Sequence, residues 1–236
     1  MKKVLGMGNA LTDILLQLNS DNILNILNLP KGSMQLIDLT KKDEIMNLLS
    51  NISPIMAAGG SASNTINGIS CLGVKTGFIG KVGDDEIGNF FKADMLNNGV
   101  KPQLLISTTN SGLCTVLVSK DSERTLCTYL GAACELSSED INPEMFQGYD
   151  IFHIEGYLVQ NHDLIRNAVV QAKKAGLIVS IDLASYNVVE SNLEFLHEIV
   201  KNYVDIVFAN EEEARSYTGK TPLDALHVIS EQCEMA

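Results

Sequence analysis

The feature that most constrains the fold is a regular alternation of short β-rich runs and helical patterns in the last third of the chain. Three strands are predicted there, each followed by a helix whose apolar residues recur at helical spacing. The strands are expected at residues 151–154, 177–181 and 206–208, and the helices at 163–175, 192–203 and 211–217. Strands joined by helices in this way run parallel, since a parallel connection needs a long crossover. The sequence therefore predicts an α/β fold with a mostly parallel sheet.

A second, smaller sheet is predicted from segments that depart from this alternation. Residues 113–119 and 125–130 are typical of an antiparallel pair, and residues 13–18 and 33–38 are two further short strands. Together these four segments are expected to form a small sheet that stands off the main one. The sequence has no internal repeat and no Pro/Gly/Ser-rich linker, so residues 1–236 are predicted to form one domain.

Charge and hydropathy exclude several classes of partner. The net charge of −12 and the absence of a basic cluster predict no nucleic-acid partner, because like charge repels a phosphate backbone. The sequence has no run of about 18 apolar residues that could span a membrane, and its N-terminus becomes polar too early for a signal peptide. A cytoplasmic protein is expected. The five cysteines include no CxxC pair, which disfavours a zinc ribbon.

A pair of glycines directly before a predicted helix is the first candidate site. Gly59 and Gly60 precede a helix over residues 61–72, and Asn64 lies one turn into that helix. Glycines let backbone N–H groups approach a ligand, and an asparagine offers both a donor and an acceptor to hydroxyl groups. The spacing fits a sugar or phosphate site, and it fits equally well a tight turn followed by a capped helix.

These residues resemble the first signature of the PfkB carbohydrate kinases, the family of ribokinase and adenosine kinase. Gly59, Gly60, Asn64, Gly73 and Gly83 stand where that pattern expects them. The resemblance implies a ribokinase-like, three-layer α/β/α fold with a small β-sheet lid formed by the second sheet. It also implies ATP-dependent phosphorylation of a hydroxymethyl group on a sugar or nucleoside, with Mg²⁺ as cofactor. Gly59, Gly60 and Asn64 would then line the acceptor pocket.

The N-terminal run GNALTDI, residues 8–14, is similar to a second part of the family pattern. The resemblance assigns Asn9 and Asp13 to the acceptor, with Asp13 holding two sugar hydroxyls. A carboxylate suits this role because it accepts charge-assisted hydrogen bonds from two neighbouring hydroxyls at once. A solvated loop aspartate is the alternative interpretation.

Acidic residues that follow predicted strands are candidates for the rest of the site. Ligands gather at the carboxyl ends of strands in open α/β sheets, where Glu155 and Asp182 are expected. Glu155 is predicted to face the acceptor, and Asp182 resembles a position near the phosphates. Asn210 and Glu213 match the family's NxxE motif, which implies a role for both at the nucleotide phosphates and for Glu213 at Mg²⁺, largely through water. An acidic first turn favoured by the helix dipole is the competing explanation.

Family members also carry a GAGD-like loop that supplies an anion hole and a catalytic base. Nothing in the 236 residues matches it, so the base is expected beyond Ala236 and this form is predicted to transfer phosphate poorly. A non-catalytic sugar-binding or regulatory protein of the same fold is the main alternative. The small sheet would also suit a homodimer, because edge strands invite pairing.

Two other nucleotide-binding classes fit the motifs less well. The run GMGNAL has Gly6 and Gly8, but Leu11 occupies the third glycine position of the dinucleotide-binding GxGxxG pattern. No GxxxxGK[ST] segment occurs, which disfavours a P-loop enzyme.

Overall fold

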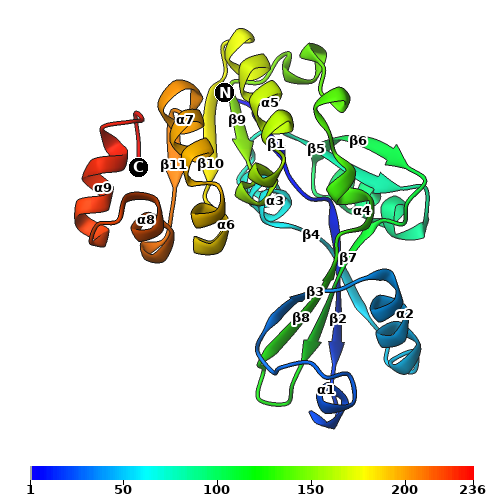
Figure 1. The fold of residues 1–236 in the computed structure, drawn as a ribbon. Helices are drawn as coiled ribbons and strands as arrows, with labels where there is room; N and C mark the ends of the chain where they lie inside the picture. Colours follow the sequence, from blue (N-terminus) through cyan, green and yellow to red (C-terminus); the bar gives the residue numbers. More distant parts are fainter. Residues whose placement is uncertain (1) are drawn as a thin grey trace.

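Two sheets organise the chain, and the smaller one projects from the body built on the larger (Figure 1). The computed structural model describes residues 2–236. Figure 1 shows the small sheet extending away from the helices that surround the main sheet, with its own two short helices beside it.

The main sheet has six strands in the order β11-β10-β9-β1-β5-β6, and every neighbouring pair is parallel. The strands are β1 (Val4–Met7), β5 (Thr76–Gly83), β6 (Val100–Ser107), β9 (Ile151–Ile154), β10 (Ile178–Asp182) and β11 (Ile206–Phe208). The predicted parallel sheet is therefore confirmed. Strand β6 was not predicted from the sequence: Pro102 interrupts its pattern, and it is tolerated because β6 is an edge strand.

Helices cover both faces of the main sheet. Helices α3 (Ser61–Cys71) and α4 (Glu86–Asn97) lie on one face, and α5 (His162–Lys174) and α7 (Leu193–Tyr203) on the other. Successive side chains of a strand point to opposite faces, and β1 shows this directly. Val4 packs in the core beside α3 and α4, whereas Leu5 and Met7 pack in the core beside α5 and α7. The result is a three-layer arrangement.

Three further helices complete the second half of the chain. They are α6 (Tyr186–Ser191), α8 (Glu211–Thr218) and α9 (Pro222–Ser230). Helix α6 was not predicted; it begins at Ser185, whose hydroxyl accepts from the Val188 N–H at 3.4 Å. After α9 the chain returns to the sheet, and the Val207 N–H donates to the Met235 carbonyl at 2.9 Å. None of the helices within residues 2–236 combines the length and apolar character needed to cross a bilayer.

The small sheet has five strands in the order β3-β8-β7-β2-β4. They are β2 (Leu11–Gln17), β3 (Met34–Leu36), β4 (Ile55–Gly59), β7 (Gly112–Val118) and β8 (Arg124–Tyr129). The four segments expected to build this sheet all lie in it, and β4 joins them at one edge. Strands β7 and β8 are antiparallel, as the sequence predicted, whereas β2 and β7 run parallel.

One face of the small sheet carries its own apolar core. Side chains of β2 and β7 pack there against α1 (Asn22–Ile26) and α2 (Leu39–Leu48). The N-cap of helix α2 is Asp38. Asp38 is extended and its Oδ1 accepts from the Lys41 N–H at 2.8 Å, which leaves Thr40 inside the helix. The opposite face of the sheet is free to contribute to a cavity.

Candidate functional site

A cavity of about 610 Å³ lies between the carboxyl edge of the main sheet and the open face of the small sheet. Five of the six residues predicted to bind the acceptor line it: Asn9, Asp13, Gly60, Asn64 and Glu155. They come from segments up to 146 residues apart in the sequence. The structure therefore brings the predicted acceptor residues into one place.

Glu155 joins three of the segments that form this cavity. It follows β9, and its Oε1 accepts from the Asn9 side-chain amide at 2.5 Å, while its Oε2 accepts from the Ala62 N–H at 3.3 Å. Gly8 is required beside it, because a Cβ there would overlap with the Glu155 carboxylate and with Ala62. The side chain is buried, and burial raises its pKa above the usual range. Glu155 thus fixes the end of β1 against the start of α3.

Asp13 lies in the middle of β2 and faces the cavity. Burial raises its pKa to about 6, with no hydrogen bond from any of residues 2–236 offsetting the rise. Gly59 lies on the neighbouring strand β4, where it is paired with Leu11, two positions along from the partner of Asp13, and a Cβ at Gly59 would overlap with the Asp13 carboxylate. Gly59 does not itself line the cavity. It serves the site by leaving room for the carboxylate, which retains its capacity to accept hydrogen bonds.

The start of α3 supplies the polar groups opposite Asp13. Gly60 is the N-cap residue with φ of 92°, a conformation that favours glycine, and a Cβ there would overlap with the Asn9 carbonyl. Asn64 lies one turn into the helix and its side chain is exposed to the cavity. Ser61 also lines the cavity, and its hydroxyl lies beside the Glu155 carboxylate, where it acts to lower the pKa of that group. The sequence analysis missed Ser61, although a hydroxyl residue directly after two glycines was a usable signal.

The residues predicted for the nucleotide lie outside this cavity. Asn210 caps α8, and its Oδ1 accepts from the Glu212 and Glu213 N–H groups at 3.0 and 2.9 Å. The Glu213 side chain binds Asn210 in turn. Its Oε2 accepts from the Asn210 N–H at 2.9 Å, and its Oε1 accepts from the Asn210 side-chain amide at 2.7 Å. This is a capping box, so the NxxE motif has a structural role whatever else it does.

The charge around Glu213 bears on whether these residues suit Mg²⁺. Burial raises the pKa of Glu213, and the neighbouring charge of Asp182 raises it further. Asp182 ends β10, and its Oδ1 accepts from the Ala184 N–H at 3.3 Å. No cluster of three metal-ligating side chains occurs within residues 2–236. Because both oxygens of Glu213 already accept hydrogen bonds, the donor set fits a contact to hydrated Mg²⁺ through water better than direct ligation.

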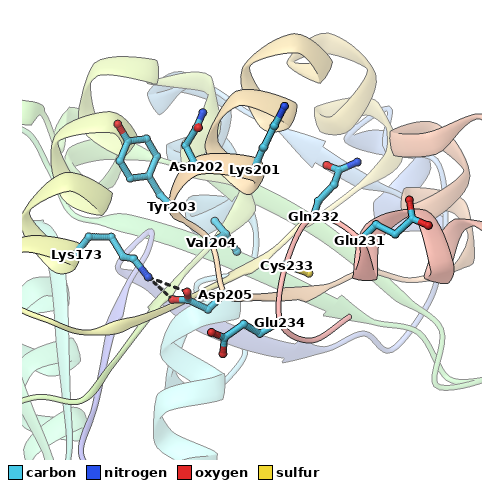
Figure 2. Close-up of a pocket in the computed structure, with 10 residues that line it drawn as sticks. All are labelled: Lys173, Lys201, Asn202, Tyr203, Val204, Asp205, Glu231, Gln232, Cys233 and Glu234. Carbon is cyan, nitrogen blue, oxygen red and sulfur yellow. Dashed lines mark hydrogen bonds and ion pairs between the residues drawn. The ribbon is translucent and has the colours of Figure 1, made fainter.

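A second hollow of about 310 Å³ lies beside the C-terminal end of α7 (Figure 2). The Lys173 ammonium donates to both carboxylate oxygens of Asp205 at 2.7 and 2.8 Å, and Asp205 also accepts from the Val179 N–H at 2.7 Å. These groups satisfy one another, and no predicted site residue lines this hollow. Its polar side chains stabilise the junction between α5 and the sheet.

The pattern of the pfkB family carbohydrate kinases matches residues 31–234. The chain belongs to this family. The chain is 29% identical over 195 residues to the probable fructokinase-5 of Arabidopsis thaliana, a match that covers 78% of this chain and 60% of that protein. The chain therefore spans less than two thirds of this relative.

Solved structures of family members have the same fold as this chain. The adenosine kinase from Sinorhizobium meliloti is 32% identical with a TM-score of 0.82, and the match covers 98% of this chain and 72% of that one. The probable sugar kinase protein from Rhizobium etli CFN 42 is 31% identical with a TM-score of 0.83 and the same coverage. The predicted ribokinase-like α/β fold, with its parallel main sheet and second mixed sheet, is confirmed.

Proposed function

We propose that this chain binds a sugar or nucleoside in the cavity between the two sheets for ATP-dependent phosphorylation of its hydroxymethyl group. The observation that carries the proposal is Asp13, a carboxylate that faces the cavity and accepts no hydrogen bond from the described residues 2–236. Two neighbouring hydroxyls of a sugar would supply the missing donors. Asn64 and Ser61 offer further hydrogen-bonding groups on the opposite side of the cavity. The small sheet would act as the lid.

In the proposed reaction the hydroxymethyl oxygen attacks the γ-phosphorus of ATP. A new O–P bond forms, the bond from the γ-phosphorus to the bridging oxygen breaks, and ADP leaves with that electron pair. The hydroxyl proton passes to a base. Asp13 and Glu155 are proposed to bind and order the acceptor side, and neither is assigned as that base. Mg²⁺, when bound, neutralises charge on the phosphates.

We assign the nucleotide side to the edge formed by Asp182, Asn210 and Glu213. Asp182 ends β10, and Asn210 and Glu213 follow β11; the carboxyl ends of both strands lie at the same edge of the parallel sheet as Glu155. The capping box holds the Glu213 carboxylate in one orientation, which suits the ordering of Mg²⁺-bound water.

The test is an ADP-release assay of the chain with Mg²⁺-ATP and, in turn, adenosine, ribose and fructose, with acceptor binding measured by calorimetry in parallel. We expect one acceptor to bind and this binding to be lost in Asp13→Ala, with slow ADP release because no base is assigned within these residues. Binding without ADP release would favour the non-catalytic binding protein. The proposal would be contradicted if none of the three acceptors bound, or if the Asp13→Ala variant bound its acceptor as tightly as the wild-type chain.

A further inference from the structure

The cavity face of the small sheet changes from polar to apolar along one row of residues. Strand register places Asp13 of β2 beside Cys114 of β7, Cys114 beside Thr128 of β8, and Thr128 beside Leu36 of β3. All four line the cavity. With strands about 4.8 Å apart, the row spans roughly 14 Å. The carboxylate therefore lies at one end of an elongated surface whose other end is a leucine.

A neighbouring row extends the apolar end of this surface. Leu126 of β8 is paired with Met34 of β3, and both also line the cavity. Met34 is 52% exposed and Leu36 67% exposed, so both present apolar surface that a ligand in the cavity could cover. A ligand that covered them would gain about 25 cal/mol for each Å² of apolar surface removed from water.

The wall opposite this surface is apolar as well. It is formed by side chains from the main body of the chain: Leu136, Leu158, Leu164 and Val188. Polar side chains from the same part of the chain also line the cavity: Tyr157, Gln160, Asn161, Ser185 and Asn187. The cavity thus contains an apolar slot lined by side chains of both the small sheet and the main body, with amide groups among them.

Charge restricts the ligand further. Among the residues of the described chain that line the cavity, Asp13 and Glu155 are acidic and none is Lys, Arg or His. A phosphorylated sugar or a sugar acid would place its negative charge near two carboxylates with no cation to compensate it. The cavity therefore favours an uncharged acceptor.

A free sugar would use only part of this cavity. Its ring carries hydroxyls on most of its carbons, and burying them against Met34 and Leu36 without partners is unfavourable. A nucleoside fits both parts of the cavity. Its ribose hydroxyls can donate to Asp13, and its flat base has apolar faces that suit the slot and a polar edge that suits the amide groups.

We propose that the acceptor is an uncharged nucleoside whose base lies against Met34, Leu36 and Leu126. This inference rests on the proposed function, because it assigns the ribose to the Asp13 end of the same site. It narrows the acceptor from sugars in general to sugars that carry a nucleobase.

Calorimetry without nucleotide tests the inference, with adenosine, ribose, fructose and fructose 6-phosphate as probes. Adenosine is expected to bind at least about tenfold more tightly than either free sugar, and fructose 6-phosphate most weakly. Leu36→Ser should weaken adenosine binding by about tenfold and leave ribose binding unchanged, because lost apolar contact in a pocket has effects of this size. Leu223→Ser is the matched control: Leu223 is 69% exposed on α9 and does not line the cavity.

The contrary outcomes separate the inference from the proposed function. If ribose or fructose binds as tightly as adenosine, and Leu36→Ser changes neither, the nucleoside assignment is overturned while the kinase proposal stands. Tighter binding of fructose 6-phosphate would overturn the charge argument. If no probe binds and Asp13→Ala also has no effect, both proposals fail together.

Discussion

Asp13 and Glu213 are both acidic residues that the family resemblance assigned to ligands, and the structure places them in opposite situations. Asp13 faces a cavity and accepts no hydrogen bond from residues 2–236, whereas both oxygens of Glu213 accept hydrogen bonds from Asn210. Unused hydrogen-bonding capacity leaves the Asp13 carboxylate able to bind the proposed ligand. A fully bonded carboxylate already has a structural role, and any ligand role is additional to it.

The largest effect is expected from Gly59→Ala, which places a methyl group where the Asp13 carboxylate lies. Acceptor affinity should fall by about a hundredfold or more, because two charge-assisted hydrogen bonds of about 1.5–3 kcal/mol each are lost. Calorimetry with the best acceptor measures this. Gly68→Ala is the control, since a Cβ at Gly68 meets no atom within 4 Å; there α3 should gain about 0.5–1 kcal/mol of stability. Equal affinity in the two variants would contradict the role of Gly59.

A smaller loss is expected from Asp13→Asn, which keeps the shape of the side chain and removes its charge. Affinity for the acceptor should fall by about tenfold, because hydrogen bonds to a charged group are roughly twice as strong as neutral ones. Thermal stability should stay the same or rise, since a poorly solvated charge is removed. A loss of stability with unchanged affinity would show that Asp13 is structural.

Acidification should mimic Asp13→Asn in the wild-type chain. The pKa of Asp13 is about 6, so its carboxylate is ionised at pH 7.5 and mostly protonated at pH 5, where acceptor affinity should be about tenfold lower. The folding stability of the chain without acceptor should change with pH in the opposite direction. The native pKa lies above the unfolded value, so Asp13 favours folding most below pH 4, and this contribution is lost as pH rises through 6. Both trends should be absent in Asp13→Asn.

The smallest effect on acceptor binding is expected from Glu213→Gln. Glutamine keeps one oxygen for the capping box and loses the second acceptor, so stability should fall by less than about 1 kcal/mol, measured by urea unfolding, while acceptor affinity stays the same. If Glu213 also orders hydrated Mg²⁺, the Mg²⁺ dependence of ATP binding should weaken as well. Glu212→Gln is the control, because the Glu212 side chain is exposed in the same turn. A fall in acceptor affinity equal to that in ATP binding would indicate a general folding defect.

The sequence could predict the fold class and most of the elements because the information is local. The strand β11 has the predicted bounds, and α3 begins where predicted, after Gly60. The periodicity of apolar residues and the placement of glycines act over a few residues, so one segment suffices to recognise them. The edge strand β6 was missed because its local pattern is weak and its pairing with β5 defines it.

What only the tertiary structure decided is the identity of the neighbours at the site. The bond between Asn9 and Glu155 joins residues 146 positions apart, and the register from Asp13 to Leu36 depends on how four strands align. A shift of one residue in a strand would turn Leu36 away from the cavity, and no local pattern fixes that alignment. The sequence by itself determined that a parallel sheet and a glycine-opened helix form. Packing between distant segments determined that Asp13 keeps its hydrogen-bonding capacity and that Glu213 does not.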